Sequence, residues 1–132
     1  MNNEVLLKYL DNAAMEASID DDEHIYITSG LDFPIWVILD EEYNRIFFQT
    51  YTSMKEISKS DAYEFVNIAS SSVMMPNFYV TSEDDTTHYL YANYALFYNE
   101  ELTPKSFINA ARRFSEAFKF AATLDENDFY LP

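Results

Sequence analysis

The chain has 132 residues, 48% of them hydrophobic, and its 23 acidic residues outnumber its 8 lysines and arginines, so the formal net charge is −15. This length and composition predict a single domain, residues 1–132, with one core. The charge argues against binding to nucleic acid or to an anionic membrane surface, because both would be repelled. The absence of cysteine excludes disulfides, thiolate metal sites and cysteine nucleophiles.

The residue types that are scarce or abundant narrow the function further. The one glycine, Gly30, cannot supply the several glycines that phosphate-binding loops need. The first residues lack the pattern of a secretory signal, and no apolar run is long enough to span a membrane, so we expect a cytoplasmic protein. Aromatic residues make up 17% of the chain, more than a routine small core requires, so part of this surface is expected to face a partner.

The first half of the chain begins with a helix and continues with strands. Apolar residues at three- and four-residue spacing predict a helix from Glu4 to about Glu16. Period-two alternation then predicts three strands, which short polar breaks join in the manner of neighbouring antiparallel strands. These strands cover residues 24–29, 33–40 and 45–52.

The second half also begins with a helix and continues with strands, and it ends with a further helix. Ser60-Asp61 are expected to cap a second helix, which ends at Met74-Met75-Pro76. Two strands follow at residues 77–82 and 87–98, and Thr103-Pro104 open a long last helix. The predicted order is α-β-β-β-α-β-β-α, an α+β fold with a five-stranded antiparallel sheet and flanking helices.

Alternate residues of a strand point to opposite faces of a sheet, so each predicted strand divides into two sets. The set expected to form the core under the first and last helices contains Phe33, Ile35, Val37, Leu39, Ile46, Phe48, Phe78, Val80, Leu90 and Ala92. The opposite set is also apolar and contains Trp36, Ile38, Phe47, Tyr51, Tyr79, Tyr89 and Tyr91, interleaved with Gln49, Thr81 and Asn93. We therefore expect something to cover the second face.

The area of the second set supports that expectation. Six of its side chains are aromatic, and each can bury about 150–250 Å², whereas the largest patch that a monomer usually exposes is about 300–600 Å². Three coverings remain open, namely the second helix, a second copy of the chain, or a foreign protein. The candidate partner-binding residues are Trp36, Phe47, Tyr51, Tyr79 and Tyr91.

The candidates for chemistry are weaker. His24 and His88 lie on separate predicted strands without the paired spacing of a zinc site. The acidic run at residues 20–23 lacks the glycine of a calcium-binding loop, and Leu31 stands where its last carboxylate would be. Ser70-Ser71-Ser72 has no nucleophile-elbow glycines and no identifiable base. We expect no catalytic residue, no metal and no cofactor.

Two charged groups leave alternatives open. The carboxylates of residues 83–85 keep an acid/base enzyme as a further hypothesis. Half of the basic residues lie on the last predicted helix, at Lys105, Arg112, Arg113 and Lys119. Surface ion pairs, for example with Glu116, explain these cations, and docking of an acidic segment is the alternative.

Several features are best considered together, namely the element order, the acidic turn before residues 24–27, the aromatic meander of residues 33–51, Phe65-Val66-Asn67 and the closing helix that starts at Leu102-Thr103-Pro104. In this combination the chain resembles the YbjN-like family of bacteria. The resemblance covers roughly Glu4 to Leu124. It implies a fold like that of type III secretion chaperones, and a non-enzymatic sensory transduction regulator or chaperone-like dimer.

These observations lead to a hypothesis and its rivals. The leading hypothesis is a non-enzymatic, cytoplasmic protein-binding or chaperone-like regulatory domain that forms a homodimer. The alternative is an acidic decoy or immunity-type inhibitor that occupies a basic protein surface, because the net charge of −15 would attract one. The partner's identity and any small ligand are not predicted.

Overall fold

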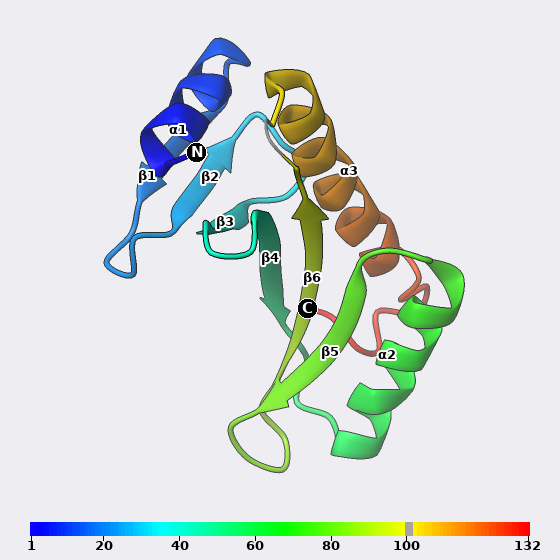
Figure 1. Ribbon diagram of the computed structural model, residues 1–132. Coiled ribbons are helices and arrows are strands. Elements are labelled where there is room, and N and C mark those ends of the chain that lie inside the picture. The colour runs from blue at the N-terminus through cyan, green and yellow to red at the C-terminus, as the bar shows by residue number, and fades with distance from the viewer. Residues whose placement is uncertain (100–101) are drawn as a thin grey trace.

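The computed structural model describes residues 1–99 and 102–132. Its elements, in chain order, are α1 (Asn3–Asn12), β1 (Glu16–Ile19), β2 (Ile25–Ser29), β3 (Ile35–Asp40), β4 (Arg45–Ser53), α2 (Lys59–Ser72), β5 (Asn77–Ser82), β6 (His88–Phe97) and α3 (Pro104–Ala122). The strands form an antiparallel sheet in the order β1-β2-β3-β4-β6-β5. Figure 1 shows α3 running beside β6 and α2 beside β5, with α1 at the β1–β2 end.

The predicted fold class, α+β with an antiparallel sheet and three helices, is confirmed, but the predicted number of strands is wrong. Over the described residues the sheet has six strands and not five, because Glu16–Ile19 form β1 and pair with β2. The first helix ends at Asn12, earlier than predicted. Ala14 has a φ of 59°, a left-handed conformation that a helix of L-residues cannot continue, so the chain turns and enters β1.

The caps of the other two helices follow known rules. The N-cap of α2 is Ser58, not the predicted Ser60, and its side chain accepts a hydrogen bond of 3.1 Å from the Asp61 N–H. The start of α3 is as predicted, with Thr103 as N-cap and Pro104 in the first turn. Each cap satisfies a backbone donor that the first turn of a helix would otherwise leave unpaired.

The predicted core lies between the sheet and the helices. Ile35, Val37, Ile46, Phe48, Phe78, Leu90 and Ala92 are buried, and Phe33, Leu39 and Val80 pack against them partly buried. The helices contribute Leu6 and Leu10 from α1, Ala62, Phe65 and Ala69 from α2, and Phe107, Phe114 and Phe118 from α3. The described parts of all three helices therefore pack on the same face of the sheet.

Two buried polar side chains tie loops to this core. The Ser115 hydroxyl of α3 donates to the Phe33 carbonyl at 2.9 Å and accepts from the Phe33 N–H at 2.6 Å, so it satisfies both backbone groups of a residue that precedes β3. His88 is 1% exposed, and its Nε2 lies 2.8 Å from the Ile57 carbonyl. A carbonyl only accepts, so Nε2 donates this bond, and the Ser82 hydroxyl lies 2.6 Å from Nδ1. These bonds give His88 a structural role.

The C-terminal segment is fastened by one carboxylate. Asp125 is 8% exposed, and its oxygens accept hydrogen bonds from the N–H groups of Phe129, Tyr130 and Leu131 at 2.8–3.2 Å. This loop holds the Tyr130 ring against Phe65 of α2, with the ring centroids 4.9 Å apart. The segment thus fixes α2 to the rest of the core.

Candidate functional site

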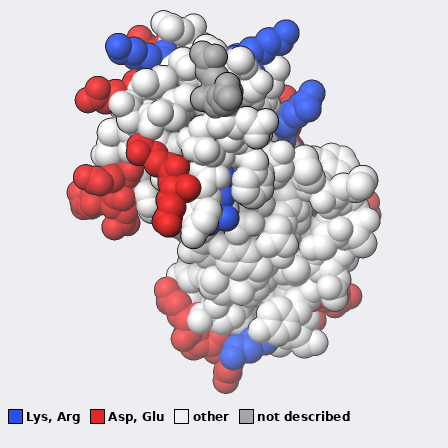
Figure 2. All heavy atoms as spheres, in the orientation of Figure 1, with Lys and Arg blue, Asp and Glu red and all other residues white. Residues whose placement is uncertain are grey.

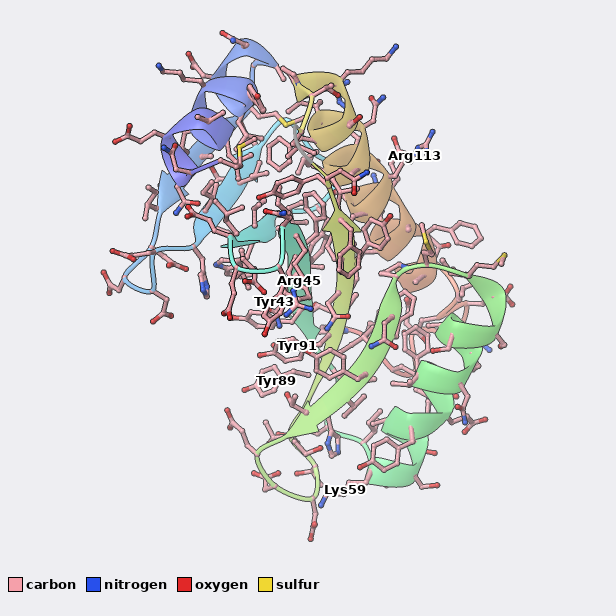
Figure 3. The ribbon with its side chains drawn as sticks, in the orientation of Figure 1. Tyr43, Arg45, Lys59, Tyr89, Tyr91 and Arg113 are labelled. Atoms are coloured by element: carbon pink, nitrogen blue, oxygen red, sulfur yellow. The ribbon has the colours of Figure 1, made fainter. Side chains whose placement is uncertain are left out.

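A row of aromatic side chains crosses five strands on the face of the sheet opposite the helices. We define the aromatic face by its residues, Tyr26, Trp36, Phe47, Tyr51, Tyr79, Tyr89 and Tyr91. Their strand neighbours, such as Val37 and Phe48, are buried in the core, so alternation places the aromatic side chains on the other side. Figure 3 shows Tyr89 and Tyr91 projecting from β6 on the side away from α2 and α3.

Five of these rings form a continuous stack. The ring centroids are 4.4 Å apart for Tyr26–Trp36, 5.4 Å for Trp36–Tyr51, 5.0 Å for Tyr51–Tyr91 and 5.2 Å for Tyr91–Tyr79. The interplanar angles lie between 15° and 25°. Because the flat sides of the rings contact one another, the stack presents ring edges and phenolic hydroxyls to the outside.

The register of the strands explains the stack. Tyr26 pairs directly with Trp36, and Tyr91 pairs with Tyr51 on one side and Tyr79 on the other. Directly opposed residues on one face bring their side chains within contact distance. The sequence places aromatic residues at these positions on neighbouring strands, so the antiparallel register builds three of the four contacts of the row.

None of the described helices covers this face. The proposal that the second helix folds back over it is wrong, because the buried residues Ala62, Phe65 and Ala69 of α2 pack on the core side. Tyr51 is 40% exposed, and the other six side chains of the face are partly exposed. Of the three predicted coverings, a second copy and a foreign protein remain.

The structure brings four of the five predicted partner-binding residues, Trp36, Tyr51, Tyr79 and Tyr91, into the stack. Phe47 lies on the same face but contacts a cation instead, since the Arg45 guanidinium lies 4.7 Å from its ring centroid. Arg45 Nε also lies 2.7 Å from Asp40 Oδ2, which fixes the guanidinium over the ring. Phe47 therefore marks the end of the face near the β3–β4 turn.

Two further aromatic residues belong to the same face. Tyr26 was not among the predicted site residues. It lies between Ile25 and Ile27, which are both buried, so period-two alternation would have placed its side chain on this face. Tyr89 was assigned to this face but not to the site. Its ring packs edge-on against Tyr51, with the centroids 6.2 Å apart and the planes at 82°.

Two tyrosines of the face have raised pKa values. Tyr89 donates a hydrogen bond of 2.9 Å to Glu83 Oε1, and this bond is the main cause that raises the pKa of Tyr89 above its ordinary value. Partial burial, and then the neighbouring Tyr51 and Tyr79, raise the pKa of Tyr91. The Gln49 amide donates to the Tyr79 hydroxyl at 3.1 Å. The face thus combines aromatic edges with uncharged hydrogen-bonding groups.

Charge is distributed around the face and not across it. In the view of Figure 2, acidic side chains gather over the β1–β2, β3–β4 and β5–β6 turns. The surface between them, over β4, β5 and β6, shows no Asp or Glu in that view. A net charge of −15 is therefore compatible with an uncharged centre that another surface can approach.

The groups considered for metal binding or nucleophilic chemistry have local explanations. Ligand atoms of Asp20, Asp22 and His24 lie within 4.8 Å of one another. The turn accounts for this closeness, because Asp20 Oδ1 accepts from the N–H groups of Asp22 and His24 at 3.0 and 2.9 Å. Ser71 donates its hydroxyl to the Asn67 carbonyl at 2.7 Å, a bond within α2.

Over residues 1–99 and 102–132, no helix is both long and apolar enough to cross a bilayer.

Comparisons with known proteins agree with this architecture. The structure is similar to the crystal structure of YbjN, "a putative transcription regulator from E. coli", with a TM-score of 0.80, 16% identity, and coverage of 100% of this chain and 97% of that one. It is also similar to an uncharacterized protein from Methanothermobacter thermautotrophicus, with a TM-score of 0.69, 14% identity, and coverage of 98% and 99%. At these identities the likeness shows the fold alone.

The sequence comparisons identify the family. The search of curated proteins gives no match. The model of the YbjN family, described as "Putative bacterial sensory transduction regulator", matches residues 2–123. Because that match spans nearly the whole chain, this protein belongs to the YbjN family.

Proposed function

We propose that this chain is a non-enzymatic, cytoplasmic regulatory domain that works by protein binding, with the aromatic face as its contact surface. The partner that binds this face is a second copy of the chain, so the domain forms a homodimer. The observation that carries the proposal is the stack of five rings across five strands, on a face that the described helices leave uncovered. Membership of a family described as regulators supports the regulatory role.

The composition of the face supports contact with protein. The buried centres of protein interfaces are rich in Tyr, Trp and Phe and poor in charge, with hydrogen-bonding groups among them. The aromatic face has these properties, since Gln49 and Asn93 lie between its rings and the acidic side chains seen in Figure 2 lie at its margins. A standard interface buries about 800 Å² on each partner. The seven aromatic side chains, which are partly exposed, provide part of that area.

Symmetry and charge together support a second copy as the occupant. A two-fold interface uses the same patch on both subunits, so the patch must be compatible with itself. A stack that presents ring edges and neutral hydroxyls meets this requirement, because each hydroxyl both donates and accepts hydrogen bonds. The acidic turns of the two copies repel each other, and salt screens this repulsion. Added salt should therefore strengthen the dimer.

Sedimentation velocity tests the proposal. The chain is measured at concentrations from about 1 to 100 μM, at low salt and again near the ionic strength of about 0.15 M where charges are well screened. We expect a monomer–dimer equilibrium that shifts toward the dimer as salt is added. A monomer at every concentration and salt level would remove the second copy as occupant.

An acidic decoy or immunity-type inhibitor is the second candidate, and the charge distribution favours it. The net charge of −15 and the acidic turns of Figure 2 would attract a basic protein surface. Salt separates the two candidates, because binding to a basic partner weakens with added salt whereas the dimer strengthens. If the protein-binding domain proposed first also acts as a chaperone, its partner should instead stay bound when the salt concentration is raised.

A further inference from the structure

The last residues of β6 have a strand partner on only one side. β4 pairs with β6 as far as Phe97, through Arg45, whereas the pairing of β5 with β6 stops at Asn77 and Asn93. Within the described ranges, no strand pairs with residues 94–97 on the side away from β4. β6 therefore has a short open edge inside the sheet, next to the start of β5.

The backbone groups at this edge point outward. Tyr98 donates its N–H to the Asn44 carbonyl, and the His88 carbonyl accepts from the Met54 N–H, both at 3.0 Å. These bonds show that even-numbered residues of β6 bond toward β4. In an antiparallel ladder, successive residues direct their N–H and C=O groups to opposite sides. The N–H and C=O groups of Ala95 and Phe97 consequently face the open edge.

A groove lies beside this edge on the helix side of the sheet. It has a volume of about 700 Å³, and the α2–β5 connection, the end of β6 and one side of α3 line it. A second hollow of about 370 Å³ shares its Met74–Pro76 wall and reaches Ala95. Met74 is fully exposed and Met75 is 54% exposed, and methionine side chains adapt readily to a bound apolar group. The edge and the groove thus form one continuous surface.

The charge of this surface differs from that of the chain. Of the lining residues within 1–99 and 102–132, none is acidic, and Arg113 is the one charged residue among them. α3 carries four basic residues and one acid, Glu116, which gives 4 − 1 = +3 on a chain of net charge −15. Among the described residues, the predicted ion pairs of Glu116 with Arg112 or Arg113 do not form. Figure 3 shows Arg113 projecting from the outer side of α3.

We propose that this edge and groove bind an extended acidic and apolar segment of a partner protein, which adds as a strand to β6. The backbone of the segment would pair with Ala95 and Phe97, alternate apolar side chains would enter the groove, and a carboxylate would bind Arg113. Strand addition of this kind takes its affinity from main-chain hydrogen bonds and its specificity from pockets for alternate side chains. The site is on the side of the sheet away from the aromatic face and goes beyond the function proposed above.

NMR measurement of peptide binding to the full chain tests this proposal. The probe is a blocked hexapeptide, Val-Thr-Val-Thr-Glu-Thr, whose Val and Glu side chains lie on one face of a strand, and the signals are the amides of Ala95 and Phe97 and the methyl groups of Met74 and Met75. We expect shifts at these four residues, slower hydrogen exchange at the two amides, and no shift of the buried Met15 and Met54 methyls. A peptide N-methylated on the residues that pair should not bind. Equal binding of the N-methylated peptide, or of a peptide with Lys in place of Glu, would overturn the proposal.

Two variants and a control complete the test. Arg113→Gln should weaken binding about tenfold, because a charge-assisted pair is lost, whereas Arg112→Gln, which does not line the groove, should leave binding unchanged. Ala95→Pro removes an N–H that faces the open edge, so it should abolish binding while the pairing with β4 persists. If that variant does not fold, the N-methylated peptide decides the same point. If the peptide shifts the signal of the Trp36 indole alone, this site is contradicted. Absence of the proposed dimer would not contradict it.

Discussion

Trp36 and Tyr51 stack with their ring centroids 5.4 Å apart and their planes at 15°, although the register pairs Trp36 with Gln49. The contact is diagonal across the β3–β4 pair, within reach of large aromatic side chains. It joins the Tyr26–Trp36 pair of β2 and β3 to the rings of β4, β6 and β5. Without it, the aromatic face would consist of two separate clusters.

Tyr51 is therefore the first residue to test on the aromatic face. It is 40% exposed and contacts the rings of Trp36, Tyr89 and Tyr91. Tyr51→Ala should raise the dissociation constant of the dimer about tenfold or more, the effect typical of a central aromatic residue of an interface. Sedimentation measures this constant. Tyr63→Ala, at an exposed tyrosine of α2, is the matched control and should leave it unchanged. Equal effects of the two substitutions would argue against the face.

Ser115 provides a test of the fold that is independent of binding. Its hydroxyl bonds both the N–H and the carbonyl of Phe33, and it is fully buried. Ser115→Ala leaves these two backbone groups without their partner, so we expect a loss of about 1–3 kcal/mol in the free energy of unfolding. Urea denaturation measures the loss, and Ser70→Ala at an exposed position of α2 should change it by less than about 0.5 kcal/mol. An unchanged midpoint for Ser115→Ala would show that the loop finds other partners.

Asp125 should control the order of the C-terminal segment. Its carboxylate accepts from three successive backbone N–H groups, those of Phe129, Tyr130 and Leu131. Asp125→Ala should therefore speed hydrogen exchange at these three amides and lower the free energy of unfolding by about 2 kcal/mol, since hydrogen bonds to charged groups are the stronger ones. Glu126→Ala, at the exposed neighbour, serves as control. Slow exchange that persists in Asp125→Ala would mean that the Tyr130 ring alone holds the segment.

The hydrogen bond between Tyr89 and Glu83 predicts a pH dependence. It raises the pKa of Tyr89 above the ordinary 10.0, and a raised folded pKa gives stability that is present below pH 10 and is lost as the pH rises through the folded value. Glu83→Gln should move the pKa of Tyr89 back toward 10.0, while that of Tyr91 stays raised, because partial burial is its main cause. Titration of the tyrosine ring signals by NMR distinguishes the two. Parallel changes at both residues would contradict these separate causes.

The sequence predicted the two faces of the sheet because a side chain's face follows from period-two alternation alone. Phe48 and Val37 turn inward, and Trp36 and Tyr51 turn outward, as that alternation requires. It could not show which face α2 would cover. That choice depends on contacts distant in sequence, such as the Ile57 carbonyl bonded to His88 and the Phe65 ring packed on Tyr130.

Two other differences have local causes. Glu16–Ile19 alternate polar and apolar residues, but the stretch is only four residues long and none of them is buried, so it is a weak strand signal. Ser58 and Ser60 are both acceptable helix caps, and composition alone does not choose between them. Pro76 marks where β5 starts, but the open edge of β6 depends on the register, which pairs Asn77 with Asn93 and which no residue pattern indicates.

The most direct test of the central claim uses the chain's one tryptophan, because Trp36 lies within the aromatic face. Acrylamide quenching of its fluorescence is measured across the concentration range in which sedimentation detects association. If the face is the contact between copies, quenching should fall as the dimer forms, and Tyr51→Ala should restore it. Quenching that stays constant while the dimer forms would contradict the claim that the aromatic face is the contact surface.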